Sequence, residues 1–109
     1  MKGMADLMRM AQKAQSDIAA LQEELQAKTV EASVGGGMVV ACANGKQQLV
    51  SLKISSEVVN PEDTEMLQDL VLAAVNEVLR KAQAMANEEM KKITGNIKIP
   101  GIFGGEKTD

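Results

Sequence analysis

Side chains capable of catalysis are scarce in this sequence. It contains no His, which is the commonest general base and a frequent metal ligand. Its one cysteine, Cys42, lies in an apolar run, where a thiol is typical of a small buried hydrophobe rather than a redox centre. Gly35-Gly36-Gly37 lacks the Gly-Lys-Ser/Thr that completes a phosphate-binding loop, and favours a flexible break between two strands. We therefore expect a protein without enzyme activity and without a cofactor.

Two groups of residues could be drawn as metal sites, but each has a structural explanation. The acids between positions 62 and 65 fall where a helix begins, and acids there interact favourably with the helix dipole. The methionines near the N-terminus could bind copper(I) or form a promiscuous surface, yet such a pattern more often means adaptable packing. We expect no metal site at either group (Glu62, Asp63 and Glu65; Met1, Met4, Met8 and Met10).

Charge is the remaining chemical signal, and it is unevenly distributed. The net charge of −3 and pI near 5.0 argue against a protein that coats DNA through overall positive charge. Residues 1–16 and residues 80–95 each sum to +2, whereas residues 17–79 sum to −7. Two basic ends on an acidic body could clamp phosphate backbones. The alternative is that they are ordinary solvated helix faces, and charge alone does not separate the two.

Three strands and two helices would position these charges. Apolar residues spaced alternately three and four apart predict a heptad seam on a helix over residues 3–27. Alternating or continuous apolar runs predict strands over residues 28–34, 38–43 and 48–54, the middle one covered on both faces. Asn44-Gly45 predicts a type I′ hairpin turn between the last two strands. The seam comprises Met4, Leu7, Ala11, Ala14, Ile18, Leu21 and Leu25.

A second helix is predicted from Asn60 as N-cap and Pro61 as first helical residue to Thr94, before Gly95. Residues 66–79 are apolar nearly all round, which predicts deep burial, while the remainder should project. Residues 1–95 then form a single domain. The tail, residues 96–109, reads as a flexible end whose apolar side chains could still dock (Ile97, Ile99, Ile102 and Phe103).

The expected architecture is α+β, in the order α-β-β-β-α, with an antiparallel sheet. The second helix would be about 50 Å long, whereas a domain of this length has a radius of gyration of only about 13 Å. We therefore expect the start of the first helix and the end of the second to meet at the tip of a two-helix arm. The sheet would form the body under the helices. Its open edges and near absence of aromatic bulk favour a symmetric homodimer, formed through the strands and the first half of the second helix, over a monomer with a covered edge.

Cellular location is constrained by what the sequence lacks. There is no N-terminal apolar run typical of a signal peptide, no run of the roughly 18 apolar residues that cross a membrane, and no cysteine pair. We expect a cytoplasmic protein with neither a membrane nor a small-molecule substrate as partner.

Several blocks of the sequence resemble the YbaB/EbfC family of bacterial nucleoid-associated proteins. The resemblance is carried by Gly35-Gly-Gly-Met38 before an apolar strand, by Asn44-Gly45, and by Val59-Asn-Pro-Glu-Asp63 opening a helix. It continues through residues 66–76, Met-Leu-Gln-Asp-Leu-Val-Leu-Ala-Ala-Val-Asn, and residues 99–103, Ile-Pro-Gly-Ile-Phe. These blocks span nearly the whole chain.

The resemblance implies a tweezer-like homodimer in the nucleoid that binds double-stranded DNA with modest sequence preference and affects nucleoid organisation and gene expression. It places the DNA contacts on the first and last helices. The basic residues that match are Lys2, Arg9, Lys13, Arg80, Lys81, Lys91 and Lys92. The alternative function is a protein-interaction adaptor for recombination or replication factors, bound through Met8, Met10 or residues 97–103.

Overall fold

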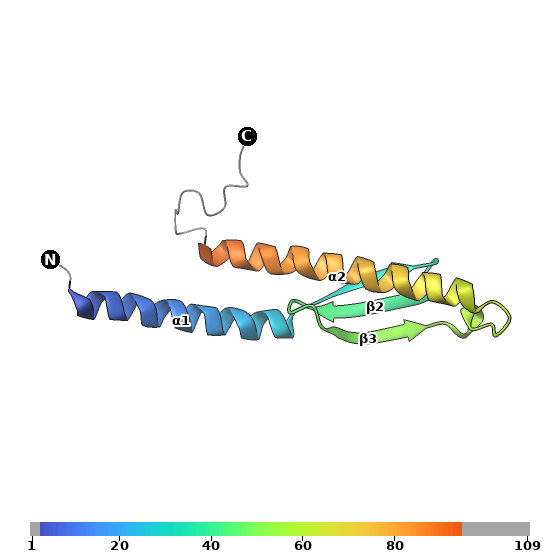
Figure 1. Ribbon diagram of the computed structural model, residues 1–109, viewed down its shortest axis with the longest axis horizontal. Coiled ribbons are helices and arrows are strands. Elements are labelled where there is room, and N and C mark those ends of the chain that lie inside the picture. The colour runs from blue at the N-terminus through green and yellow to red at the C-terminus, as the bar shows by residue number, and fades with distance from the viewer. Residues whose placement is uncertain (1–2, 95–109) are drawn as a thin grey trace, which may run out of the picture.

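The computed structural model describes residues 3–94 and confirms the predicted order of elements (Figure 1). Helix α1 (Met4–Ala27) precedes strands β1 (Thr29–Val34), β2 (Val39–Asn44) and β3 (Leu49–Ile54). A short 3-10 turn, η1 (Ser56–Val58), which the sequence did not predict, leads to helix α2 (Thr64–Thr94). Lys2 and the tail, residues 96–109, lie outside the described residues.

The antiparallel sheet has the order β1-β2-β3, and α2 lies along one of its faces (Figure 1). Alternate residues of β2 point towards α2 and are fully buried, whereas Val40 and Cys42 on the other face are half-buried. Small side chains dominate the contact, which lets the helix approach the sheet closely. The buried apolar core consists of Ala32, Val39, Ala41, Ala43, Val58, Ala74, Val78 and Ala82.

The three glycines between β1 and β2 form a defined turn rather than merely a flexible break. Gly35, Gly36 and Gly37 have φ values of 62°, 68° and 92°, in the left-handed region that other residues rarely adopt. The turn is closed by the Gly37 N–H, which donates to the Val34 carbonyl at 3.2 Å. Three successive left-handed residues explain why glycine occupies all three positions.

The turn between β2 and β3 differs from the type I′ prediction. Its left-handed residue is Gln47, with φ of 60°, and not Asn44 or Gly45. Gly45 instead lies against the end of α1, where its N–H donates to the Leu25 carbonyl at 2.7 Å. A methyl group on Gly45 would lie only 2.9 Å from that oxygen. Close approach, rather than backbone conformation, accounts for this glycine.

Helix α2 begins three residues later than predicted. Asn60 does not cap it, because the Asn60 Oδ1 accepts from the Glu62 N–H at 3.0 Å and forms a separate turn. Asp63 is the cap, since its Oδ1 accepts from the Met66 N–H at 3.2 Å. Both residues are good caps, and the sequence predicted the wrong one.

The predicted deep burial of residues 66–79 is wrong for the single chain. Only the side of α2 that faces the sheet is buried, with Ala74 and Val78 inaccessible. On the other sides Leu72 is 60% exposed and Met66 is 39% exposed. The first half of α2 therefore leaves an apolar surface uncovered.

The expected two-helix arm is also different, because α1 extends well beyond the end of α2 (Figure 1). Only α2 covers the sheet, and α1 contacts α2 near its own C-terminal end, where Leu21 and Leu25 are buried. Further towards the N-terminus Met4, Leu7 and Ile18 are all more than half exposed. The chain is elongated, with principal extents of 74 × 34 × 16 Å.

Candidate nucleic-acid interface

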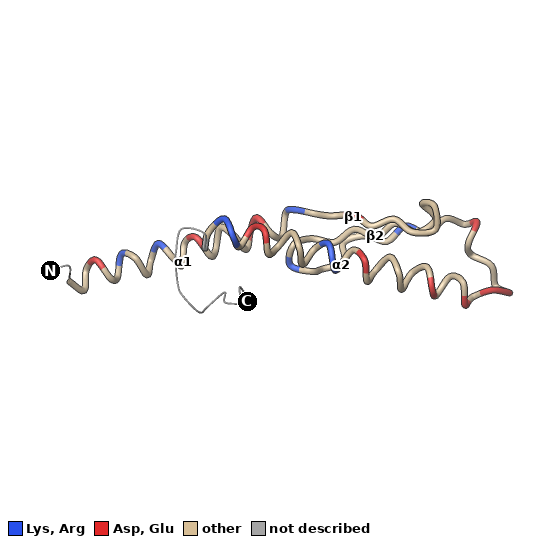
Figure 2. Tube along the Cα trace, turned by 90° about the horizontal axis from the view of Figure 1, so that it is seen from above, with Lys and Arg blue, Asp and Glu red and all other residues tan. Residues whose placement is uncertain are grey.

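The candidate cations of α1, Arg9 and Lys13, lie on the projecting part of that helix (Figure 2). Both are exposed, and both pair with acids on the same helix. The Arg9 guanidinium lies 2.8 Å from Asp6 Oδ1, and Lys13 Nζ lies 3.4 Å from Asp17 Oδ2. Charges over residues 3–18 therefore cancel: of the +2 counted for residues 1–16, one charge is that of Lys2 and the other is offset by Asp17.

Arg80 and Lys81 lie over the sheet rather than at the end of an arm. Arg80 donates through two nitrogens to the Glu77 carboxylate, at 2.6 and 3.2 Å. These hydrogen bonds lower the pKa of Glu77 below its ordinary value and raise that of Arg80. Lys81 Nζ donates to the backbone carbonyl of Glu31 on β1 at 2.9 Å. Lys81 thus also ties α2 to one edge of the sheet.

Lys91 and Lys92 occupy the last turns of α2 but have different surroundings. Lys91 is 3.6 Å from Glu88, and both side chains are about 70% exposed. Lys92 is 3.2 Å from Glu89, whose side chain is only 7% exposed. Lys91 is therefore a surface cation, whereas Lys92 takes part in a partly buried ion-pair network.

Glu89 is the centre of that network, which joins the two helices. Lys28 Nζ lies 2.6 Å from Glu89 Oε2 and 3.3 Å from Glu24 Oε2. The hydrogen bond from Lys28 is the largest influence that lowers the pKa of Glu89, to about 2, and the bond from Lys92 adds to it. The same contacts raise the pKa of Lys28. This network could not be predicted from the sequence, because nothing in the spacing of Lys28 and Glu89 brings them together.

Acidic residues gather at the opposite end of the molecule. Figure 2 shows Asp and Glu around the connection from β3 to α2 and the first turns of α2, at the end far from the N-terminus. No Lys or Arg occurs between Lys53 and Arg80. The acids of this end are Glu57, Glu62, Asp63, Glu65 and Asp69. The acidic body predicted from the sequence is thus concentrated at one end.

The predicted cations do not form one continuous patch. Arg9 and Lys13 lie on projecting α1, Lys91 and Lys92 lie where α2 ends beside α1, and Arg80 and Lys81 lie over the sheet (Figure 2). All three locations are away from the acidic end. The arrangement suits an extended polyanion that runs along the molecule better than a compact ligand.

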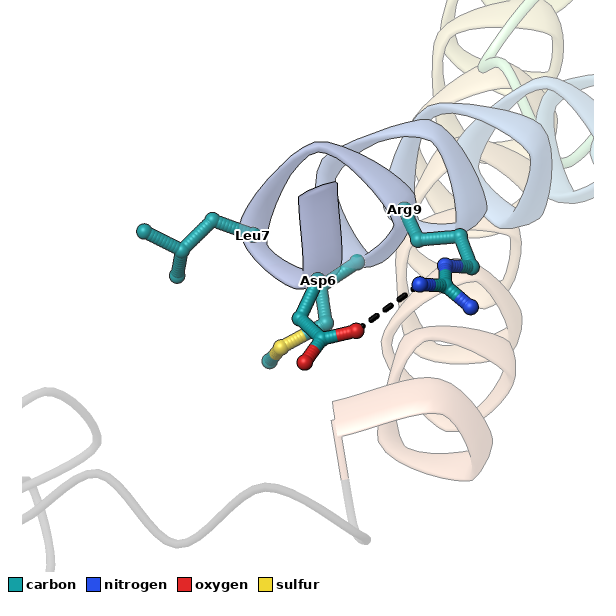
Figure 3. A pocket seen from close by; sticks show the side chains of 4 residues that line it. Asp6, Leu7 and Arg9 are labelled. Carbon is teal, nitrogen blue, oxygen red and sulfur yellow. Dashed lines mark hydrogen bonds and ion pairs between the residues drawn. The ribbon is translucent and has the colours of Figure 1, made fainter. Parts of the chain in front are cut away.

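An open hollow of about 430 Å³ is lined by Asp6, Leu7, Arg9 and Met10 (Figure 3). Leu7 and the paired Asp6 and Arg9 point to different sides of α1. Within residues 3–94, no cluster of three or more His, Cys, Asp or Glu side chains is arranged to hold a metal ion. Neither described helix has a stretch long and apolar enough to cross a membrane.

Comparison with known proteins identifies relatives along nearly the whole chain. A nucleoid-associated protein of Pelotomaculum thermopropionicum is 54% identical over 92% of this chain and 95% of its own. A nucleoid-associated protein of Moorella thermoacetica is 57% identical over 94% of this chain and 98% of its own. The crystal structure of an uncharacterized protein from Helicobacter pylori has the same fold, with a TM-score of 0.68 at 24% identity over 89% of this chain and 98% of that one. Residues 1–97 match the YbaB/EbfC DNA-binding family, and the chain belongs to that family, which is a DNA-binding family rather than an enzyme class.

Proposed function

We propose that this protein binds double-stranded DNA in the nucleoid, as a homodimer, with little sequence preference. The exposed cations of α1 and of the second half of α2 contact phosphates, and the acidic end stays away from the DNA. The relatives described as nucleoid-associated proteins support this location and role.

The observation that carries the proposal is the polarity of charge along the molecule. Five acids and no cations occupy the end around the connection from β3 to α2, while the exposed candidate cations lie elsewhere. The cation side chains with surface ion pairs are 67–78% exposed (Arg9, Lys13, Arg80 and Lys91), and Lys92, whose partner Glu89 is buried, is itself 66% exposed. Electrostatic repulsion at one end and attraction over the rest orient a DNA duplex along the long axis.

Phosphate contacts, rather than base contacts, fit the side chains available. Exposed ion pairs contribute at most about 1 kcal/mol, so a phosphate can replace a carboxylate as the partner of Arg9, Lys13 or Lys91 at little cost. Residues 3–94 contain no aromatic side chain on which a base could stack. Duplex DNA should therefore be preferred over single strands, and its sequence should matter little.

The second half of the proposal, the homodimer, rests on β3. This strand forms one edge of the sheet, and all six of its residues are exposed. They include Val50 at 52% and Leu49 at 44% exposure, so the edge presents apolar side chains and unpaired backbone groups together. Leu72 and Met66 add apolar surface on α2. A second copy that covers this surface also doubles the number of cations available to one DNA duplex.

A duplex-DNA titration at two salt concentrations tests the DNA proposal. We expect the logarithm of the binding constant to fall linearly with the logarithm of salt concentration, with a slope of about −0.9 for each phosphate contact. Scrambled duplexes should bind equally, and single strands of equal length more weakly. An affinity that does not depend on salt would contradict binding through phosphate contacts. Equal affinity for single strands would contradict the preference for duplex DNA.

A further inference from the structure

The apolar seam of α1 is covered over only part of its length. It is buried at Leu21 and Leu25, where α2 and the β2–β3 turn lie beside it. Towards the N-terminus Ile18 is 53% exposed, Leu7 60% and Met4 74%. Leu7 and Leu25 are eighteen residues apart, which is five turns of helix, so they lie on the same line along α1. The uncovered stretch thus continues the face that α2 covers.

The ion pair between Lys28 and Glu89 shows where the cover ends. The helices run antiparallel (Figure 1), and Thr94 lies five residues, or about 7.5 Å, beyond Glu89 along α2. The Lys28 side chain reaches back to Glu24, so Glu89 lies beside about residue 25 of α1 and the end of α2 lies beside about residue 20. From there to Met4 the seam continues for about 24 Å with no covering element among residues 3–94.

The chain that follows α2 has the length and composition to cover this stretch. Fifteen residues follow Thr94, and the nine from Gly95 to Phe103 reach about 30 Å when extended. That is enough to run from the end of α2 along the seam as far as Met4. The same nine residues contain no acidic side chain and four large apolar ones, Ile97, Ile99, Ile102 and Phe103.

We propose that residues 97–103 lie along the exposed seam of α1 in the same chain, antiparallel to the helix, and extend the cover that α2 provides. The open hollow beside Leu7 and Met10, which Asp6 and Arg9 also line, lies within reach of the Phe103 ring. Attachment through α2 holds the segment close to the seam, so the local concentration strongly favours it over a segment of a separate molecule.

The sequence offers a direct probe, because the chain has no Trp or Tyr and Phe103 is its only aromatic residue. In the full-length Phe103→Trp variant, the single Trp should emit at shorter wavelength than free tryptophan and show a several-fold lower acrylamide quenching constant. Adding Leu7→Gln should return both values to those of an exposed Trp. Met8→Gln is the matched control, because Met8 is also 60% exposed but lies about 100° around the helix from Leu7.

A mixing experiment distinguishes the same chain from a second copy. When the Phe103→Trp/Leu7→Gln variant is mixed with excess wild-type chain, its Trp should stay exposed, because a tail in the same chain cannot use the intact seam of another. Recovery of the short-wavelength emission would overturn the proposal in favour of an exchanged tail. A third outcome would also overturn the proposal. If the emission of the Phe103→Trp variant depends on protein concentration and Leu7→Gln forms a smaller oligomer than the wild type, the seam is covered by a second copy of the chain.

A second measurement uses the natural Phe103. Deleting residues 96–109 should shift the methyl NMR signals of Leu7 and Ile18 but not that of Ile54 on β3. Unchanged Leu7 and Ile18 signals would overturn the proposal even if the Trp variant behaved as expected. Both experiments are done without DNA, so their failure leaves the proposed DNA binding untouched.

Discussion

The Lys28 ammonium, at the C-cap of α1, lies 2.6 Å from the Glu89 carboxylate on α2, across 61 residues of sequence. Glu89 is nearly buried, whereas Lys28 is 42% exposed on its side chain. The pair joins the C-terminal end of α1 to the last turns of α2, next to the buried Leu21 and Leu25. The rest of α1, towards the N-terminus, projects.

Stability in acid should depend on Glu89. Its pKa is lowered to about 2 from an ordinary value of 4.5, so its contribution to the free energy of unfolding is fully present above pH 4.5 and is lost as the pH falls towards 2. Glu89→Gln should lower the stability at neutral pH and flatten this acid dependence. Urea denaturation at several pH values measures both effects. Glu88→Gln, at an exposed neighbouring carboxylate, should leave the curve unchanged, and an equal effect of the two variants would contradict the assigned role.

Gly45 should be intolerant of even a methyl group. Gly45→Ala places a carbon 2.9 Å from the Leu25 carbonyl oxygen and 2.8 Å from Leu25 Cδ2, and the backbone atom cannot move aside as a side chain could. We expect a loss of about 2 to 3 kcal/mol in the free energy of unfolding. Gly36→Ala is the comparison, because its space is open and only its left-handed φ is unfavourable, at about 1 kcal/mol. A smaller loss for Gly45→Ala than for Gly36→Ala would refute the close-approach explanation.

The pair of Arg80 and Glu77 provides a test of the DNA-binding surface in both directions. Glu77→Gln removes the negative partner and should tighten duplex binding, while Arg80→Ala should weaken it and reduce the salt slope by about 0.9 for each subunit engaged. Gel-shift titrations of the two variants at matched salt provide the comparison. Changes in the same direction for both variants would exclude Arg80 from the phosphate contacts.

The proposed dimer should be sensitive to charge on β3. Val50→Lys leaves the isolated chain undisturbed, because Val50 is already 52% exposed, but it places an ammonium group in the proposed interface. Sedimentation at low micromolar concentration should show twice the 11.6 kDa chain mass for the wild type and a single chain for the variant. Thr29→Lys, on the strand at the opposite edge of the sheet, is the control and should remain dimeric. A wild-type chain that sediments at 11.6 kDa would remove the dimer altogether.

Local patterns predicted the elements well because each depends on neighbouring residues. Three-four spacing located α1 and alternation located the strands, within about one residue at most ends. The start of α2 was misplaced because Asn60 and Asp63 are both good caps, and the choice between them depends on how η1 and the following turn pack.

Longer-range relationships were beyond the sequence. Asn44-Gly45 has the composition of a tight hairpin, but the contact of Gly45 with Leu25 depends on where α1 ends in space. The predicted seam of α1 is buried only at Leu21 and Leu25, because the spacing of its residues contains no information on how far α2 runs beside it. For the cations, composition identified basic residues, but only the structure shows that Lys91 pairs with an exposed acid, Glu88, and Lys92 with a buried one, Glu89.

The projection of α1 has a mechanical meaning. Within the described residues the helix is held at one end only: it packs near Leu21 and Leu25 and has no support for about 24 Å towards Met4. A tilt of about 10° at the support moves the free end by about 4 Å, which is comparable to one helical turn. The separation between cations on α1 and those on α2 is then set by the bending stiffness of one helix. A segment bound along the apolar face of α1 would stiffen the helix. Release of that segment would let the helix bend to follow duplexes of different curvature.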